Sequence, residues 1–277
     1  MRLVKSSFEI IEQQSGEVGM LKHIETCGRV AWKSEERITD DSHISFVNML
    51  KGVNHGSVLE HGTVYLKVSH ELNSTILNAI SFFSRNKYTK TVFKDYDNFA
   101  YITTNYRVII DENYNWILKY QCEPTEFHEK RYTVRFICDR GVSHEYVRHR
   151  TFSFTQESTR YCNYTKDKFS NELTYIQPCW LEDMNTRVHD VLLYKDSLKY
   201  IEHRYFELIN EGWKPQQARS ILPNSLKTEL IMTGFVSDWK HFIDLRSNGT
   251  TGAPHPDMKK VADMLKDEFI ELKYYDR

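Results

Sequence analysis

One short run in the middle of the chain concentrates side chains that bind anions. Residues 148–161 read Arg-His-Arg-Thr-Phe-Ser-Phe-Thr-Gln-Glu-Ser-Thr-Arg-Tyr. A guanidinium presents a rigid fork of donors that matches the oxygens of a phosphate or a carboxylate. Three of these cations so close together repel one another unless an anion or water separates them. The run therefore predicts a pocket for an anionic, planar and phosphorylated ligand, with a solvated basic surface as the alternative.

Composition and charge bound the class of protein. The chain has 277 residues, of which 40% are hydrophobic and 27% charged, with a net charge of -1. These values are ordinary for a globular protein, and the charge argues against non-specific nucleic-acid binding. No apolar run is as long as a membrane span, and no signal peptide is recognisable. We expect a cytoplasmic protein with no nucleic-acid partner and no membrane partner.

Cysteine usage points the same way. The cysteines are odd in number and scattered, without a Cys-x-x-Cys pair: Cys27, Cys122, Cys138, Cys162 and Cys179. This pattern excludes a zinc ribbon and a disulfide framework, and it fits a reducing compartment. We expect no metal site.

The periodicity of apolar residues predicts the elements that must position the basic run. Alternation predicts strands over 63–68 and 131–138, and a third strand is expected over 226–235. Helical spacing and capping residues predict helices over 21–33, 42–50, 72–83, 185–210, 215–220, 237–245 and from Pro256 onward. Ser143 is expected to cap a short helix that leads into the basic run. The predicted fold is α+β, a single domain with helices packed on a mostly antiparallel sheet.

The helix over 185–210 carries the clearest apolar stripe. Its members are Val188, Val191, Leu192, Leu198, Ile201, Tyr205, Leu208 and Ile209. At this spacing they are expected to form one buried face. Gly212 stands where a glycine ends a helix.

Arg148-His149-Arg150, followed by seven residues and Ser158, resembles the signature of the flavin-dependent thymidylate synthases. Three further segments are similar to that family in the same order. They are 55–61, 217–223 (Gln-Ala-Arg-Ser-Ile-Leu-Pro) and 239–246, the last with His255-Pro256 after it. The resemblance implies methylation of deoxyuridine monophosphate (dUMP). In that family methylenetetrahydrofolate gives the carbon, and FAD, reduced by NADPH, gives the hydride. It also implies a homotetramer with each flavin held between subunits.

The resemblance also implies roles for individual residues. The residues matching flavin contacts are Ser57, Arg148, His149, Arg150, Gln156, Phe235, Ser237 and His241, with His55 near the folate or the nucleotide. The residues matching nucleotide contacts are Glu145, Arg148, Gln156, Glu157, Ser158, Thr159, Arg160, Arg219 and Arg246. Arg246 is the implied catalytic residue, because a donor at the pyrimidine edge stabilises negative charge that develops on the ring. Ser158 is expected to be a binding hydroxyl, so that the enzyme uses no nucleophile.

The chain departs from the family pattern in three places. Gln156 stands where many members have Glu, and Phe235 and Ser237 replace polar or basic residues. The stretch from 69 to 130 is longer than in compact members, so we interpret it as an insertion. Its aromatic residues are expected to form a small subsidiary core: Tyr96, Phe99, Tyr101, Tyr106, Tyr114 and Trp116.

Two alternatives stay open. The arginines with interleaved aromatic rings would suit a non-catalytic nucleotide- or RNA-binding protein. His149 would suit a phosphatase nucleophile if an acid were supplied from elsewhere in the chain. Pro178-Cys179-Trp180 resembles a Pro-Cys active site, but no arginine or histidine pattern surrounds it. His55 and His61 are as compatible with structural roles as with a site.

Overall fold

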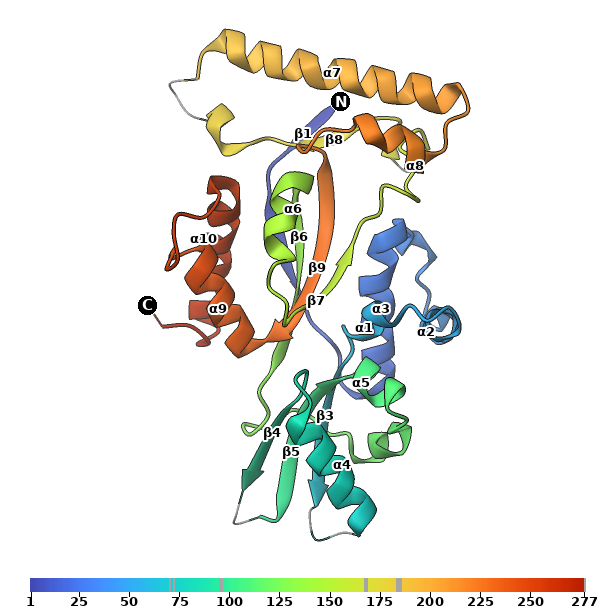
Figure 1. Cartoon of the computed structure of the whole chain (residues 1–277), viewed down its shortest axis with the longest axis vertical. Coiled ribbons are helices and arrows are strands. Elements are labelled where there is room, and N and C mark those ends of the chain that lie inside the picture. Colours follow the sequence, from blue (N-terminus) through green and yellow to red (C-terminus); the bar gives the residue numbers. More distant parts are fainter. Residues whose placement is uncertain (70, 72, 95–96, 167–168, 183–185, 277) are drawn as a thin grey trace.

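The computed structural model describes residues 1–277 except 70, 72, 95–96, 167–168, 183–185 and 277. The molecule is elongated, with a central sheet, a second sheet at one end and a long helix across the other end (Figure 1). Antiparallel pairing dominates, and helices cover the sheets. The predicted α+β class is therefore confirmed.

The central sheet is the frame for the basic run. It contains β2 (Ser7–Ile11), β6 (Arg131–Asp139), β9 (Lys227–Phe235) and β7 (Ser153–Gln156), in the order β2-β6-β9-β7, and all neighbours are antiparallel. β6 and β9 pair over their full length, from Arg131 opposite Phe235 to Asp139 opposite Lys227.

One face of this sheet is apolar. Alternating residues such as Val134, Phe136, Leu230 and Met232 are fully buried there. They pack with α6 (Arg140–Tyr146), α9 (Val236–Arg246) and α10 (Pro256–Glu271) around Trp239. This core fixes α6 and α9, the two helices that flank the Arg-His-Arg run.

The second sheet lies at the lower end in Figure 1. Its order is β3-β5-β4, and its strands are β3 (Thr63–Ser69), β5 (Phe99–Asn105) and β4 (Lys90–Lys94). The elements around it are α4 (Ser74–Arg85), α5 (Tyr106–Asp111) and η3 (Asn115–Tyr120), and the N-terminal ones are α1 (Gly16–Arg29), η1 (Val30–Trp32), η2 (Glu35–Arg37), α2 (Ser42–Gly52) and α3 (Gly56–Leu59).

The expected subsidiary core in this region is not a separate one. Tyr106, Tyr114 and Trp116 pack in a cluster that also contains Ile24 of α1 and Phe46 of α2. Tyr101 instead contacts Phe127, with ring centroids 4.8 Å apart. Tyr96 lies outside the described residues. The 69–130 stretch therefore shares its core with the N-terminal helices, because the inward faces of β3 and β5 meet α1 and α2 as well as α4.

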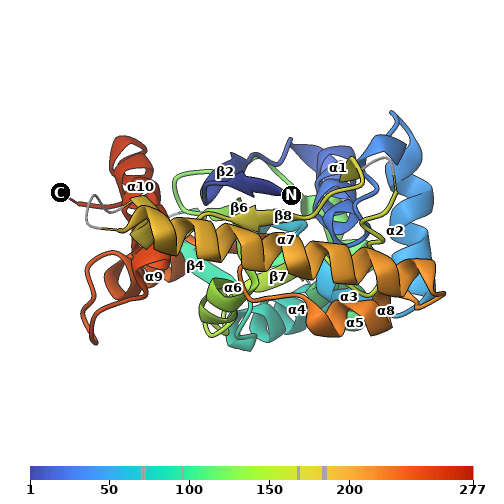
Figure 2. The same ribbon diagram turned by 90° about the horizontal axis from the view of Figure 1, so that it is seen from above.

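The opposite end holds β1 (Arg2–Val4) and β8 (Thr174–Ile176), which pair in parallel. η5 (Cys179–Glu182), α7 (Val188–Asn210), α8 (Pro215–Ala218) and η6 (Arg219–Ile221) complete this end. α7 crosses the molecule like a bar (Figures 1 and 2).

The predicted buried stripe of α7 is wrong in part. Leu198 and Tyr205 are buried, but Val188 is 76% exposed and Leu192 is 54% exposed. α7 lies on the rim, so only its middle and its C-terminal half meet other elements. Apolar periodicity shows that a face exists and does not show what covers it.

The other predicted elements are confirmed with shifted ends. α1, α2, β3, α4, β6, α8, β9, α9 and α10 occupy the predicted segments. The predicted starts at Leu72 and Asn185 lie outside the described residues. α6 begins at Arg140, because the Asp139 side chain accepts from Val142 N at 2.6 Å, so Asp139 is the cap in place of Ser143.

Two general properties complete the fold. In the described part of the chain, no helix combines the length and the apolar character needed to cross a bilayer. The five cysteines are free, and no group of three His, Cys, Asp or Glu among the described residues is arranged to hold a metal ion.

Candidate functional site

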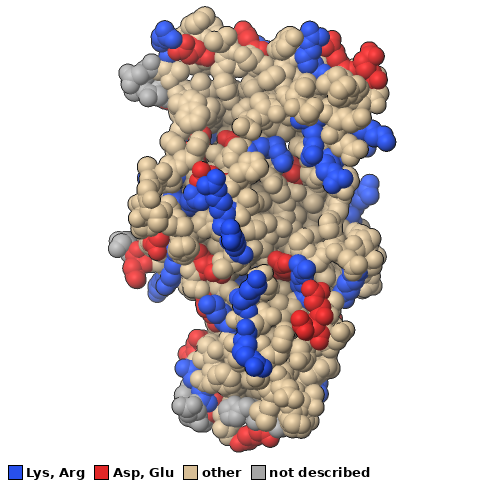
Figure 3. All heavy atoms as spheres, in the orientation of Figure 1, with Lys and Arg blue, Asp and Glu red and all other residues tan. Residues whose placement is uncertain are grey.

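The Arg-His-Arg run forms the turn between α6 and β7. Arg148 and Arg150 are exposed, whereas His149 is only 7% exposed. Neither arginine forms an ion pair with a carboxylate of the described residues. Figure 3 shows Lys and Arg side chains along the middle of one face, with acidic side chains beside them. The positive charge is therefore local, and both guanidiniums of the turn are free to meet an anion.

Arg246, the last residue of α9, ties this turn to α6. Its Nε donates to His149 Nε2 at 3.0 Å, and its Nη2 donates to the backbone oxygen of Glu145 at 3.0 Å. Its Nη1 also forms an ion pair with the Glu145 carboxylate. The ring of His241 lies 6.4 Å from that of His149. The structure thus brings together four predicted residues from α6, the turn and α9.

His149 is neutral at physiological pH. Burial, with the nearby Arg246 and His241 acting in the same direction, lowers its pKa to about 4. Because Nε2 accepts a hydrogen bond, the ring proton resides on Nδ1. Nε2 is therefore not free to attack phosphorus, which argues against the phosphatase alternative.

Gln156 and Glu157 anchor the end of β7. The Gln156 amide donates to Ser143 Oγ at 3.0 Å and to Thr228 Oγ1 at 3.2 Å, so it bridges α6 and β9. Glu157 is 2% exposed, and its carboxylate accepts from Tyr164 OH and from Lys227 Nζ, both at 3.0 Å. Glu157 is thus satisfied within the chain.

A charged network continues from this anchor. The carboxylate of Glu229 accepts from Lys33 at 2.8 Å and also pairs with Lys227 and Arg135. Burial opposes ionisation of Glu229, but Lys227 and Lys33 outweigh burial and hold its pKa at about 2. Three cations around one buried carboxylate fix the strand positions that flank β7.

The next residues form a loop rich in hydroxyls. Ser158 N donates to Ala31 O of η1 at 3.0 Å, and Ser158 Oγ accepts from Arg160 N at 3.3 Å. Thr159 Oγ1 accepts from Arg219 Nη1 at 3.3 Å. Arg160 and Arg219 are exposed and form no ion pair within the described part of the chain. Thr159 is only 4% exposed, so the loop presents the Ser158 hydroxyl and two guanidiniums without carboxylate partners in the described residues, which suits a phosphate.

The remaining predicted contacts lie around this core of the site. His55 is exposed at the start of α3, with its ring 5.6 Å from that of Trp32. Trp32 in turn lies 6.3 Å from Tyr161, next to the hydroxyl loop. Ser57 is also exposed on α3. His55 and Trp32 thus lie beside the hydroxyl loop.

Phe235 and Ser237 lie at the start of α9. Phe235 is buried, and the cations of Arg131 and Lys90 each lie 5.6 Å from its ring centroid. The exposed Ser237 donates its backbone N–H to the Glu129 carboxylate at 2.9 Å. Sequence reasoning missed Arg131 and Lys90. The pairing of Arg131 with Phe235 joins strands about a hundred residues apart, and no local pattern signals it.

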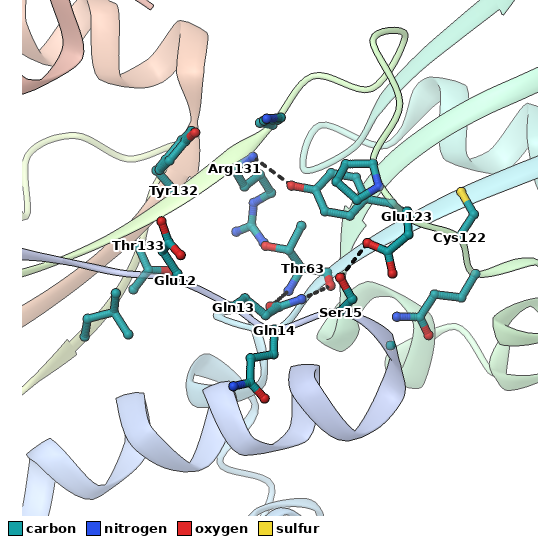
Figure 4. Close-up of a pocket in the computed structure, with 16 residues that line it drawn as sticks. Glu12, Gln13, Gln14, Ser15, Thr63, Cys122, Glu123, Arg131, Tyr132 and Thr133 are labelled. Atoms are coloured by element: carbon teal, nitrogen blue, oxygen red, sulfur yellow. Dashed lines mark hydrogen bonds between the residues drawn. The ribbon is translucent and has the colours of Figure 1, made fainter. Parts of the chain in front are cut away.

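Two cavities lie near these residues. One, of about 270 Å³, has Glu157, Lys33, Lys227 and Tyr164 in its wall. The other, of about 180 Å³, lies where β3 meets β6 and has Thr63, Arg131 and Thr133 in its wall (Figure 4). No predicted site residue lines the second cavity. Of the sixteen predicted ligand contacts, eight are exposed on the single chain, among them Arg148, Arg150, Arg160 and Arg219.

The nucleophile alternatives find no support in the geometry. Within the described residues, Ser158 Oγ bonds to no histidine or carboxylate that would act as a base. Burial raises the pKa of the Cys179 thiol, and Asp257 raises it further. A protonated thiol is a weak nucleophile, so Cys179 is not poised for attack.

Comparisons with known proteins find one family and several of its members. A family model described as thymidylate synthase complementing protein matches residues 88–272. The flavin-dependent thymidylate synthase of Pyrococcus furiosus is 36% identical over 112 residues, which cover 39% of this chain and 43% of that protein. The one from Mycobacterium marinum is 29% identical over 122 residues, covering 39% and 46%. The probable one from Paramecium bursaria Chlorella virus 1 is 28% identical over 155 residues, covering 50% and 66%.

These matches are partial. The chain spans less than half of the length of the first two relatives and just under two thirds of the viral one. Among solved structures, a UMP/dUMP methylase from Streptomyces cacaoi bound with 5-bromo-dUMP aligns over 98% of this chain and 93% of its own, at 15% identity and a TM-score of 0.47. A likeness of this size supports no conclusion about fold or ligand.

Proposed function

Because the chain belongs to the thymidylate synthase complementing protein family, we propose that it is a flavin-dependent thymidylate synthase. In this proposal it methylates dUMP to dTMP, with methylenetetrahydrofolate as the carbon donor and FAD, reduced by NADPH, as the hydride carrier. The observation that carries the proposal is the convergence of Arg246, Glu145 and His149 beside two unpaired arginines.

The residues of the turn fit a flavin dinucleotide. Arg148 and Arg150 are exposed and lack carboxylate partners among the described residues, so they suit the two phosphates of FAD. The neutral ring of His149 packs 5.0 Å from the ring of Phe242 and 6.4 Å from that of His241. Ser57, Gln156, Phe235 and Ser237 complete the proposed contacts. When bound, FAD would supply the hydride that the methylation needs.

The hydroxyl loop fits the phosphate of dUMP. Ser158 offers a hydroxyl, the buried Thr159 contributes by holding Arg219, and Arg160 and Arg219 offer charge, so that two guanidiniums meet a dianion. Each charge-assisted hydrogen bond contributes about 1.5–3 kcal/mol. Glu157 supports this loop from beneath through Lys227 and Tyr164. We assign Glu157 to holding the loop, with contact to the ligand through its neighbours.

Arg246 is the proposed catalytic residue. All three of its donor groups are engaged, with His149 and with Glu145. The guanidinium is thus held in one orientation, with its side chain 15% exposed. A preorganised donor of this kind stabilises negative charge on the pyrimidine ring, which is what makes the ring reactive. The Glu145 carboxylate competes with the ligand for the same guanidinium.

The remaining parts of the proposal follow from the resemblance. They are the absence of an enzyme nucleophile, the homotetramer with flavins between subunits, NADPH as reductant, and residues 69–130 as an insertion. The open position of the site on a single chain is compatible with a neighbouring subunit closing it. The cytoplasmic location stays a prediction.

The test is formation of dTMP. Purified protein with FAD, NADPH, methylenetetrahydrofolate and dUMP should give dTMP, detected by chromatography and mass. Omitting FAD should stop the reaction, and omitting dUMP provides the blank. No product from a folded, FAD-loaded protein would contradict the proposal.

A further inference from the structure

A chain of hydrogen-bonded histidine and threonine side chains crosses the interior behind the site. It links His23 Nε2 to Thr133 Oγ1 at 2.9 Å, Thr133 to Thr233 Oγ1 at 2.7 Å, Thr233 to His61 Nδ1 at 2.7 Å, and His61 Nε2 to Thr155 Oγ1 at 3.0 Å. Its members come from α1, β6, β9, the segment between α3 and β3, and β7. It therefore joins three strands of the central sheet to α1 and to the segment before β3.

The chain is dry. None of its members is more than 6% exposed, and His61 and Thr233 are fully buried. Burial lowers the pKa of His23 to about 4 and holds that of His61 well below its usual value, and Arg131 acts on both in the same direction. Both rings are thus neutral at pH 7. A neutral ring has one donor and one acceptor, so the two bonds of His61 run in opposite senses.

β7 is the element that gains most from this chain. It has only four residues, lies at the edge of the sheet, and pairs with β9 alone. Yet it carries Gln156 and leads directly into the loop of Ser158 and Thr159. A strand this short with one ladder is weakly held. Side-chain contacts from outside the β7–β9 pair therefore determine how rigidly β7 is held.

Two contacts tether the buried face of β7. Thr155 bonds to His61, and Ser153 Oγ accepts from Arg131 Nη2 at 3.4 Å. Arg131 also donates to the backbone oxygen of Glu60 at 3.1 and 3.2 Å. Ser153 and Thr155 are two residues apart, so they share one face of the strand. Residues 60–61 are thus connected to β7 at two points.

We propose that His61 is a positioning residue of the site: by bridging Thr155 and Thr233, it fixes β7 against β9 and so sets the place of Gln156 and of the 158–160 loop. This inference rests on the proposed function, because the loop is the proposed phosphate site. His61 is fully buried and touches no ligand, so its effect is transmitted by Thr155.

The test compares near-isosteric variants in the FAD-loaded protein. Thr155→Val removes the contact of β7 with His61, and Thr155→Ser keeps the hydroxyl. Thr133→Val removes bonds of the same chain away from β7. Thr103→Val removes a buried hydroxyl that has no hydrogen-bond partner in the described residues. The measurements are the Kd for dUMP, from the change in flavin absorbance, and the unfolding temperature.

We expect Thr155→Val to raise the Kd for dUMP about tenfold, the size of one buried hydrogen bond. Thr155→Ser should restore the wild-type Kd. Thr133→Val should lower the unfolding temperature at least as much as Thr155→Val but keep the Kd within about twofold, and Thr103→Val should change neither. This pattern separates positioning from general stability.

Two results would overturn the inference. One is an unchanged Kd in Thr155→Val, and the other is an equal rise in Kd in Thr133→Val. If Thr155→Val fails to fold while Thr155→Ser folds with wild-type stability but with a raised Kd, the hydroxyl contact is structural only and the inference also fails. A wild-type protein that takes up neither FAD nor dUMP overturns the proposed function and, with it, this inference.

Discussion

Arg246 donates its Nε–H to Nε2 of His149, which lies 97 residues earlier in the chain, at a distance of 3.0 Å. The bond is possible because burial keeps the imidazole neutral, so that Nε2 has a lone pair to offer. Together with Glu145, it holds the guanidinium of Arg246 still. A guanidinium held in one orientation is what a preorganised donor at this site requires.

Replacing Arg246 by alanine should strongly reduce methylation and leave the flavin in place. The guanidinium is the proposed donor to the pyrimidine, so its loss should cost roughly 10²–10³ in turnover. Turnover is measured as dTMP formed, and FAD content by visible absorbance. A colourless Arg246→Ala protein would instead place this residue in the flavin site.

Replacing Glu145 by glutamine should tighten dUMP binding. The neutral amide keeps the shape of the side chain but no longer competes as a charge for Arg246. We expect the Kd for dUMP to fall about threefold to tenfold, since an ion pair no longer has to open. Titration with dUMP measures this, with Glu182→Gln, which removes a carboxylate that pairs with Lys5 and Lys260, as the control. A weaker affinity in Glu145→Gln would mean that the carboxylate itself binds the nucleotide.

Replacing Arg150 by alanine should weaken the binding of FAD more than the binding of dUMP. Losing one charge-assisted contact to a phosphate should raise the Kd for FAD about tenfold to a hundredfold. The matched control is Arg187→Ala. Arg187 is the exposed residue directly before α7, and its guanidinium pairs with Asp190. Fluorescence titration gives the Kd for FAD of each variant. Equal Kd values in Arg150→Ala and Arg187→Ala would contradict the flavin assignment of the turn.

Replacing Ser158 by alanine should leave measurable turnover. In this account its hydroxyl binds phosphate and attacks nothing, so we expect a raised KM for dUMP and a kcat within about tenfold of wild type. Steady-state kinetics of dTMP formation separate the two. A folded, FAD-loaded Ser158→Ala protein with no activity at saturating dUMP would reopen a serine mechanism.

Acid stability should report on Glu229. Its pKa is about 2 in the folded protein, below the ordinary value of 4.5, because Lys227 and Lys33 face it. A carboxylate with a lowered pKa stabilises the fold above pH 4.5, and this contribution is lost as the pH falls from 4.5 toward 2. Its size is on the order of 3 kcal/mol. Glu229→Gln should therefore flatten the fall of the unfolding free energy in this window, measured with urea. An unchanged slope would show that other groups dominate.

The long elements and the site motif can be predicted from the sequence for physical reasons. β6, α9 and α10 each bury one face, so their periodicity is regular over nine or more residues, whereas β9 is buried on both faces and reads as a continuous run. β1, β7 and β8 have three or four residues each, and their pairing partners lie far along the chain. No local pattern identifies such strands. They form because the rest of the fold brings their partners to them.

The same distinction holds within the site. The spacing of Arg148, His149, Arg150 and Ser158 is local and visible in the sequence. The ion pair of Glu145 with Arg246 joins residues 101 positions apart, and the contact of His61 with Thr155 joins residues 94 apart. Side chains recognisable by type are thus predictable, whereas the contacts that orient them depend on the tertiary fold.

The central claim is that flavin and dUMP share the site around the Arg-His-Arg turn. The most direct measurement is the visible absorbance spectrum of the FAD-loaded protein before and after dUMP is added. In the wild type, we predict that the flavin bands shift as dUMP is added and that this shift reaches saturation. In Arg219→Ala, the shift at the same dUMP concentration should be smaller. A protein that takes up no FAD, or flavin bands that dUMP leaves unchanged, would contradict the account.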